Sequence, residues 1–135
     1  MGDGAIIKIV GVQVLVEEPA LHSVVYLSKS HDGTKDFMVP LLRKAYSHLK
    51  NNLGGVHYAS GAENYADLFA FQVINQYRLK CEEWSKRDGM KHNWEYEFHL
   101  QEDFNQVPTW YKRYRVNLLA KQIVFSNGRT TPLEV

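Results

Sequence analysis

The sequence predicts an α+β fold: an antiparallel sheet with two helices packed on one face, in the element order ββααβββ. Three observations lead to this prediction. Two stretches rich in β-branched residues come first, two stretches with an apolar period of three to four residues follow, and alternating stretches occupy the last third. Strands separated by a helix pair are typical of α+β proteins, and two-residue alternation favours antiparallel pairing.

The first two strands are predicted at 6–16 and 21–29, joined by a loop over 17–20. The first strand is apolar on both faces, because its valines at even positions alternate with Ile7, Ile9 and Leu15. A strand of this kind needs cover on both sides. Two helices cover only one face, so we predict that the chain self-associates as a homo-oligomer. The alternative is that the sheet curls over itself.

Two helices are predicted at 36–53 and 61–86. The first has an apolar stripe and ends at Gly54-Gly55, since glycine accepts the left-handed conformation found after a helix. Ser60 and Glu63 fit a capping box at the start of the second helix. Its inner stripe includes Cys81, which we interpret as a small buried apolar residue.

Three strands are predicted in the last third, at 92–101, 110–119 and 122–126. The first alternates strictly, with Trp94, Tyr96, Phe98 and Leu100 on one side. Asn127-Gly128 predicts a type I′ hairpin turn after the last strand.

A hairpin between the strands around 96 and 114 would place Glu97 opposite Arg113 and Glu95 opposite Arg115. One interpretation of this charged face is cross-strand ion pairing in solvent. The other is a polar surface that binds an anionic ligand, because arginine forms paired hydrogen bonds with phosphate. Its candidate ligand-binding residues are Arg113, Arg115, Tyr111 and His99.

A second candidate site is the glycine-containing loop over 54–61, which leads into a predicted helix. Free N–H groups and the helix dipole favour anions there, and His57 and Ser60 could add a base and a hydroxyl. The alternative is that Gly54-Gly55 ends one helix and Ser60 caps the next. The loop lacks the P-loop and dinucleotide-binding fingerprints.

Composition and motifs predict neither a metal, a cofactor nor a catalytic residue. The six histidines show no ligand spacing, and the single cysteine excludes an intrachain disulfide. No apolar stretch reaches the roughly 20 residues that span a bilayer, and no signal peptide is recognisable. We therefore expect a cytoplasmic protein, not bound to a membrane, whose 135 residues form a single domain.

The favoured function is that of a non-catalytic binding protein, of the inhibitor, sequestering or assembly type. Its partner would be a protein or a small anionic, nucleotide-like ligand. One alternative is binding of single-stranded nucleic acid through the strand at 110–117. The net charge of +1 argues against a nucleic-acid coat, although it leaves room for a local basic patch. Another alternative is a small enzyme for a phosphorylated or nucleotide-like substrate, with His57 or His99 as general acid–base.

Overall fold

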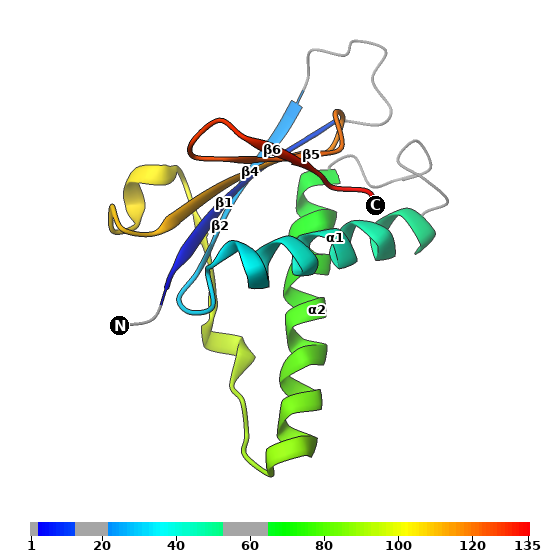
Figure 1. The fold of residues 1–135 in the computed structure, drawn as a ribbon, viewed down its shortest axis with the longest axis vertical. Coiled ribbons are helices and arrows are strands. Elements are labelled where there is room, and N and C mark those ends of the chain that lie inside the picture. Colours follow the sequence, from blue (N-terminus) through cyan, green and yellow to red (C-terminus); the bar gives the residue numbers. More distant parts are fainter. Residues whose placement is uncertain (1–2, 13–21, 53–64) are drawn as a thin grey trace.

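The computed structural model describes residues 3–12, 22–52 and 65–135. In this part of the chain, six strands form a sheet in the spatial order β3-β2-β1-β4-β5-β6, with two long helices beside it (Figure 1). The strands are β1 (Ala5–Val12), β2 (His22–Lys29), β3 (Phe98–Gln101), β4 (Lys112–Asn117), β5 (Gln122–Phe125) and β6 (Thr130–Pro132). The helices are α1 (Lys35–Asn52) and α2 (Tyr65–Asp88), and two short 3-10 turns are η2 (Trp94–Tyr96) and η3 (Phe104–Gln106).

Each long helix is stabilised by an apolar stripe that faces the sheet. Residues three and four apart lie on one side of a helix, and these positions are buried. The stripes consist of Leu41, Leu42, Ala45, Tyr46 and Leu49 in α1, and of Ala66, Phe69, Ala70, Val73, Tyr77 and Cys81 in α2. Both stripes belong to one core with Ala5, Ile7 and Ile9 of β1. Since these alternate residues share one face of the strand, both helices pack on the same face of the sheet.

The sheet is mixed, so the prediction of a purely antiparallel sheet is wrong. β1 pairs antiparallel with β2, placing Ile7 opposite Leu27, but it pairs parallel with β4, placing Ile7 opposite Tyr114. The helices bury Ala5, Ile7 and Ile9 on one face of β1, and Ile6 is buried on the other, so the apolar character of both faces reflects cover from both sides. β6 adds a further strand, so the order is ββααββββ rather than ββααβββ. The α+β class is confirmed.

The predicted strand over 92–101 is a strand only at its end. Residues 94–96 form η2, and β3 begins at Phe98. Trp94 and Phe98 pack against the core, whereas Tyr96 and Leu100 are exposed. A four-residue step across a helical turn brings Trp94 and Phe98 to the same side, which the predicted two-residue period did not anticipate.

The predicted hairpin between the strands around 96 and 114 is also wrong. β3 pairs with β2 and β4 pairs with β1, so two strands lie between them. Glu97 and Glu95 therefore do not stand opposite Arg113 and Arg115. Instead, the Glu97 carboxylate lies 3.6 Å from the Lys29 ammonium nitrogen.

The segment 102–111 crosses the sheet on the face opposite the helices. Its Phe104 ring packs edge-on against Tyr26 of β2 (5.3 Å between centroids) and lies within cation–π distance of two arginines of β4. Ile6 of β1 points to this face and is 0% exposed. The chain itself thus covers the second face of β1 at Ile6. This removes one argument for self-association, while the oligomeric state stays a prediction.

The C-terminal hairpin forms with a different turn from the predicted one. A type I′ turn needs positive φ at both central residues. In the described part of the chain, Asp32 and Lys121 are the non-glycine residues with positive φ, so Asn127 does not meet this requirement. Gly128 has φ of 85°, and its N–H donates to the Phe125 carbonyl at 2.9 Å. Gly128, the residue after the two central positions of this turn, therefore carries the left-handed conformation.

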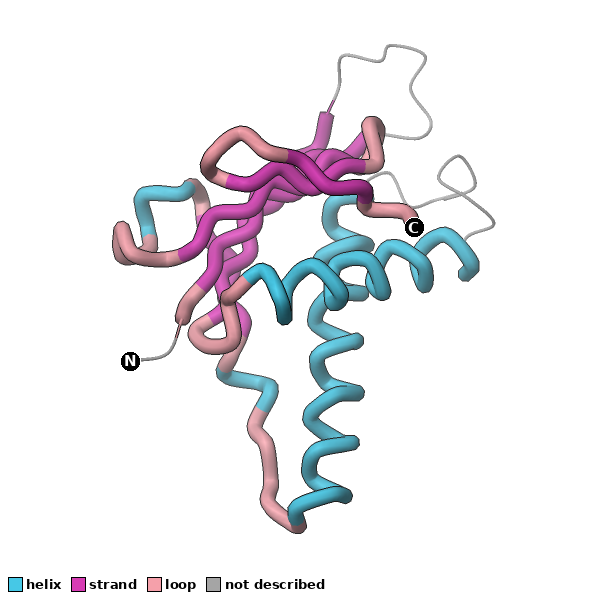
Figure 2. The backbone as a smooth tube through the Cα atoms, in the orientation of Figure 1, coloured by secondary structure: helices cyan, strands magenta, loops and turns pink. Residues whose placement is uncertain are grey.

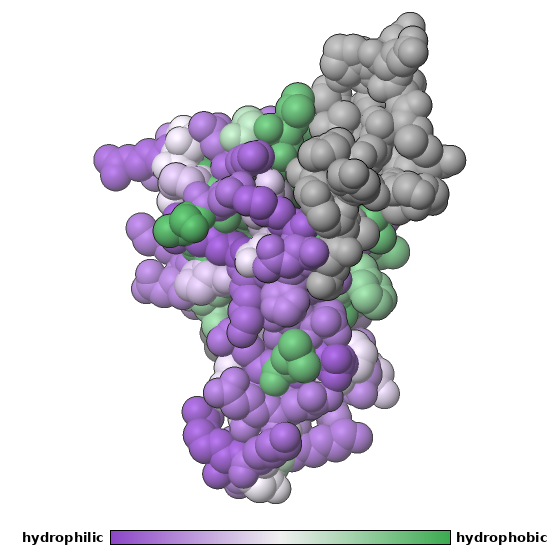
Figure 3. All heavy atoms as spheres, turned by 90° about the vertical axis from the view of Figure 1, so that its right-hand side faces the viewer, coloured by the Kyte–Doolittle hydropathy of each residue, from purple (hydrophilic) through white to green (hydrophobic). Residues whose placement is uncertain are grey.

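The strands occupy one half of the molecule, and the C-terminal half of α2 extends away from them (Figure 2). There α2 is accompanied by the segment that leads through η2 into β3. Exposed apolar side chains on the view in Figure 3 form separate spots on a largely hydrophilic surface. This face therefore offers no continuous apolar surface outside the grey atoms.

Candidate functional site

The candidate site lies where β5 ends beside β4. Pairing between these strands begins with Tyr114 opposite Phe125, so Lys112 and Arg113 of β4 extend past the end of β5. On the other side, the same two residues are paired with Ala5 and Ile6 of β1. The result is a notch at this end of the sheet, held rigid on its β1 side. We refer to the surface around Lys112, Arg113 and the loop 126–129 as the notch.

A cavity of about 460 Å³ opens on one side of the notch. Three separate segments line it: the start of α1, the start of β4 and the β5–β6 hairpin. The lining residues are Thr34, Lys35, Lys112, Arg113, Tyr114, Phe125, Ser126, Asn127, Arg129 and Thr130. Four of these side chains are basic and none is acidic, so the cavity is suited to an anion.

A second cavity of about 280 Å³ lies on the other side of the notch. Its lining shares three residues with the first cavity and adds a fifth cation, Arg115. The lining residues are Phe104, Arg113, Arg115, Val124, Phe125, Ser126 and Gly128. The guanidinium groups of Arg113 and Arg115 lie 5.7 and 5.8 Å from the centroid of the Phe104 ring. The electron-rich face of the Phe104 ring thereby attracts both guanidinium groups and keeps them at the edge of this cavity.

In the part of the chain that the structure describes, the cations of the notch form no ion pairs, although Asp36 and Asp3 lie near Tyr114 in the wall of the first cavity. Within the described residues, none of the five cations that line the two cavities forms an ion pair with a carboxylate; they are Lys35, Lys112, Arg113, Arg115 and Arg129. Residues 104–133 contain five basic and no acidic side chains, whereas the rest of the chain has 11 basic and 15 acidic ones. The small net charge therefore conceals a strong separation of charge, with the positive part around the notch.

The wall of the first cavity is anchored by Tyr114 and Gly33. The Tyr114 hydroxyl donates to the Gly33 carbonyl at 2.6 Å, and the Gly33 N–H donates to the Asp3 carbonyl at 2.6 Å. A Cβ at Gly33 would lie 2.5 Å from a backbone carbon of Gly4, so only glycine fits there. Burial, with smaller contributions from Asp36 and Asp3, raises the pKa of Tyr114 to about 12.

The raised pKa of Tyr114 predicts how stability falls at high pH. The unfolded chain releases this proton near pH 10 while the folded chain holds it to about pH 12, so the free energy of unfolding falls across this window. Across this window, the free energy of unfolding of Tyr114→Phe should fall by on the order of 2 kcal/mol less than that of the original protein. At pH 7 it should cost about 1 kcal/mol, because the hydrogen bond to Gly33 is lost. Urea denaturation at several pH values measures both effects; an unchanged pH slope in the variant would contradict the assignment.

The structure brings together only some of the residues that the sequence suggested. Arg113 and Arg115 line the second cavity. Tyr111 lies against Trp110, with 4.7 Å between ring centroids, and its ring occupies the space beside Gly4. His99 belongs to β3, three strands away from β4, so it does not meet the arginines. His57 and Ser60 fall outside the described residues.

Three cations of the site were not among the named binding residues: Lys35, Lys112 and Arg129, although Lys112 lies in the strand at 110–117 considered for nucleic acid. They come from segments up to 94 positions apart, and no local pattern connects them. The sequence signal for Lys112 and Arg129 is the segment 104–133, which contains no acidic residue, because a segregation of charge of this kind marks an interaction surface. It identifies Lys112 and Arg129 but not Lys35, which joins them only through folding.

A second cluster of titratable groups surrounds Lys29, whose side chain is 0% exposed. Its ammonium nitrogen lies 4.1 Å from the Tyr77 ring centroid and 3.6 Å from the Glu97 carboxylate. Burial lowers the pKa of Lys29, although Glu97 and Asp32 act to raise it, and burial raises the pKa of Cys81 nearby. Because the Lys29 side chain is fully buried, a substrate cannot reach its ammonium group, and we interpret this cluster as one that stabilises the fold.

Two further features bear on the candidate chemistry. Across the described residues, no three His, Cys, Asp or Glu side chains are gathered closely enough to hold a metal ion. In the same part of the chain, neither helix combines the length and the apolar character that a membrane crossing requires.

Comparison with known proteins gives no relative: no protein-family model, no curated protein and no solved structure matches this chain. The functional argument therefore depends on the geometry and charge of the notch.

Proposed function

We propose that this protein binds a ligand with dense negative charge, such as a phosphate-bearing molecule, in the larger cavity of the notch. The observation that carries the proposal is the convergence of Lys35, Lys112 and Arg129 on one cavity of about 460 Å³ without a lining carboxylate, with Arg113 at its border. Its volume falls within the usual range for small-ligand sites. Unpaired cations brought together this way repel one another, and a bound anion relieves that repulsion.

The chemistry of the lining supports binding of phosphate in particular. Arginine offers a planar pair of donors that matches phosphate oxygens, and lysine adds a point charge. Hydroxyl groups of Thr34, Ser126 and Thr130 provide further donors. The N-terminal end of α1, which starts at Lys35, contributes a favourable dipole to the same cavity.

The same lining favours binding over catalysis. No histidine, cysteine or carboxylate is among the described residues that line the cavity, and these are the usual general bases and activated nucleophiles. A protein that recognises an anionic ligand without transforming it fits this set of side chains best.

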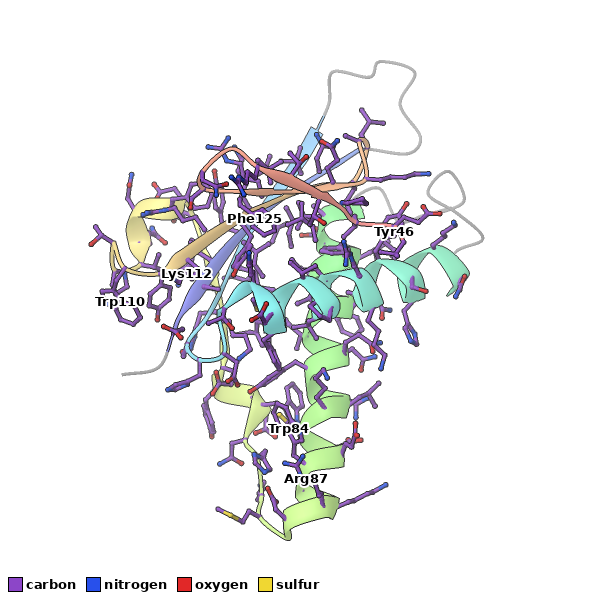
Figure 4. The ribbon with its side chains drawn as sticks, in the orientation of Figure 1. Tyr46, Trp84, Arg87, Trp110, Lys112 and Phe125 are labelled. Carbon is purple, nitrogen blue, oxygen red and sulfur yellow. The ribbon has the colours of Figure 1, made fainter. Side chains whose placement is uncertain are left out.

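Isothermal titration calorimetry with inorganic tripolyphosphate at low salt tests the proposal. We expect binding at a single site, weakened at least about tenfold by Lys112→Ala or Arg129→Ala, because each removes a charge-assisted contact of about 1.5 to 3 kcal/mol. The matched control is Arg87→Ala, which removes a cation at the far end of α2 (Figure 4). Absence of binding, or equal weakening by the control variant, would contradict the proposal.

A further inference from the structure

We infer that the natural ligand of the notch is single-stranded nucleic acid, whose backbone passes the end of β5 from one cavity to the other. This inference rests on the proposed function and specifies its ligand. The two cavities lie on either side of the point where β5 stops, and both are lined by Arg113, Phe125 and Ser126. A compact anion fills one of them, whereas a chain of repeated phosphates can occupy both.

The faces of β4 explain how one ligand can meet cations in both cavities. Successive side chains of a strand point to opposite faces. Lys112 is therefore directed to the helix side, and Arg113 and Arg115 are directed to the side crossed by Phe104. Because β5 is absent beside Lys112 and Arg113, a flexible strand can bend around the loop 126–129 and contact both sets. A rigid duplex cannot follow that path.

Aromatic side chains beside the cations provide surfaces for unpaired bases. Trp110 is 50% exposed and precedes Lys112 by two residues. Figure 4 shows Trp110 and Lys112 at the same end of the sheet, far from Arg87. Phe104 and Phe125 line the cavities themselves. Cationic grooves with aromatic stacking platforms are the common design of single-strand binders, and bases are available for stacking only when they are unpaired.

The decisive measurement is fluorescence anisotropy with a fluorescein-labelled oligothymidine of about 15 nucleotides, titrated with the full chain at several salt concentrations. We expect binding near 50 mM salt that weakens steeply as salt is added, because each phosphate contact releases a counterion. Arg113→Ala should lower the slope of log affinity against log salt by about 0.7. Trp110→Ala should weaken binding about tenfold with little change in slope, since stacking is not ionic.

Three results separate this inference from the proposed function. Equal losses in Arg113→Ala and in the control Arg87→Ala would overturn it, because binding would then depend on the overall positive charge and not on the notch. Binding of tripolyphosphate but not of the oligonucleotide would also overturn it, and would leave the proposed anion site standing. Failure of both probes would overturn both statements. Circular dichroism of each variant establishes that the fold is retained before binding is compared.

Discussion

Replacing Lys29 by alanine is expected to lower the free energy of unfolding by about 3 to 5 kcal/mol, because it breaks a buried ion pair on one side only. Lys29 is fully buried, and its ammonium group lies near Glu97, near Asp32 at 3.8 Å and against the ring of Tyr77. The lysine also donates to the His31 carbonyl, which joins the end of β2 to the turn before α1. Its removal leaves Glu97, only 17% exposed, without its buried partner.

Urea denaturation of three variants resolves the cause of this loss. Lys29→Met fills the space among Phe37, Tyr77 and Phe98 but still leaves Glu97 without its buried partner, so it should lose nearly as much stability as Lys29→Ala if the lost charge is the cause. Lys50→Ala removes the exposed lysine that pairs with Glu134 and should leave the midpoint nearly unchanged. If Lys29→Ala were as mild as Lys50→Ala, the buried pair would not stabilise the fold.

Replacing Ile6 by alanine is expected to cost about 2 to 5 kcal/mol, the usual range for truncating a buried isoleucine. Ile6 lies on the face opposite the helices, so its burial depends on the segment 102–111 that crosses there. Thermal and urea unfolding would measure the loss. The matched control is Val24→Ala on β2, since Val24 points to the same face and is 46% exposed. Comparable losses in the two variants would show that the crossing segment does not shield Ile6 in solution.

The two stability predictions concern opposite faces of β1 and β2, and they depend on the segments that precede and follow β3. Lys29 faces the helices and pairs with Glu97 just before β3. Ile6 faces the crossing segment that follows β3. The same segment places Phe104 beside Arg113 and Arg115. The burial of Ile6 and the shape of the candidate site are therefore linked through the connection from β3 to β4.

Elements with a local cause were predictable from the sequence. The apolar stripes of α1 and α2 and the β-branched residues of β1 and β2 each indicate an element without knowledge of its neighbours. The same holds for the C-terminal hairpin, where Asn127-Gly128 marks a turn although not its type. Where the predicted ranges fall within the described residues, the elements differ from them by at most two residues, as expected from the uncertainty of helix and strand ends.

Elements whose form depends on distant partners were not predictable in this way. The alternation over 92–101 suggested a longer strand, but Trp94 and Phe98 reach the core through a helical turn, and Glu97 contacts Lys29. These contacts join residues far apart in the sequence, with a separation of 21 positions for Tyr77 and Phe98 and of 68 for Lys29 and Glu97. Their energies depend on burial, which no short stretch of sequence specifies.

The sequence alone determined the α+β class, the helix pair, the first hairpin and the local charge at Arg113 and Arg115. Tertiary structure alone decided that β4 lies parallel to β1, that 102–111 covers Ile6 and that Lys35 joins Arg129 at one cavity. The physical reason is the range of the forces involved. Helical periodicity and turn preference act between residues close in sequence, whereas strand pairing and the gathering of like charges depend on which surfaces the folded chain brings together.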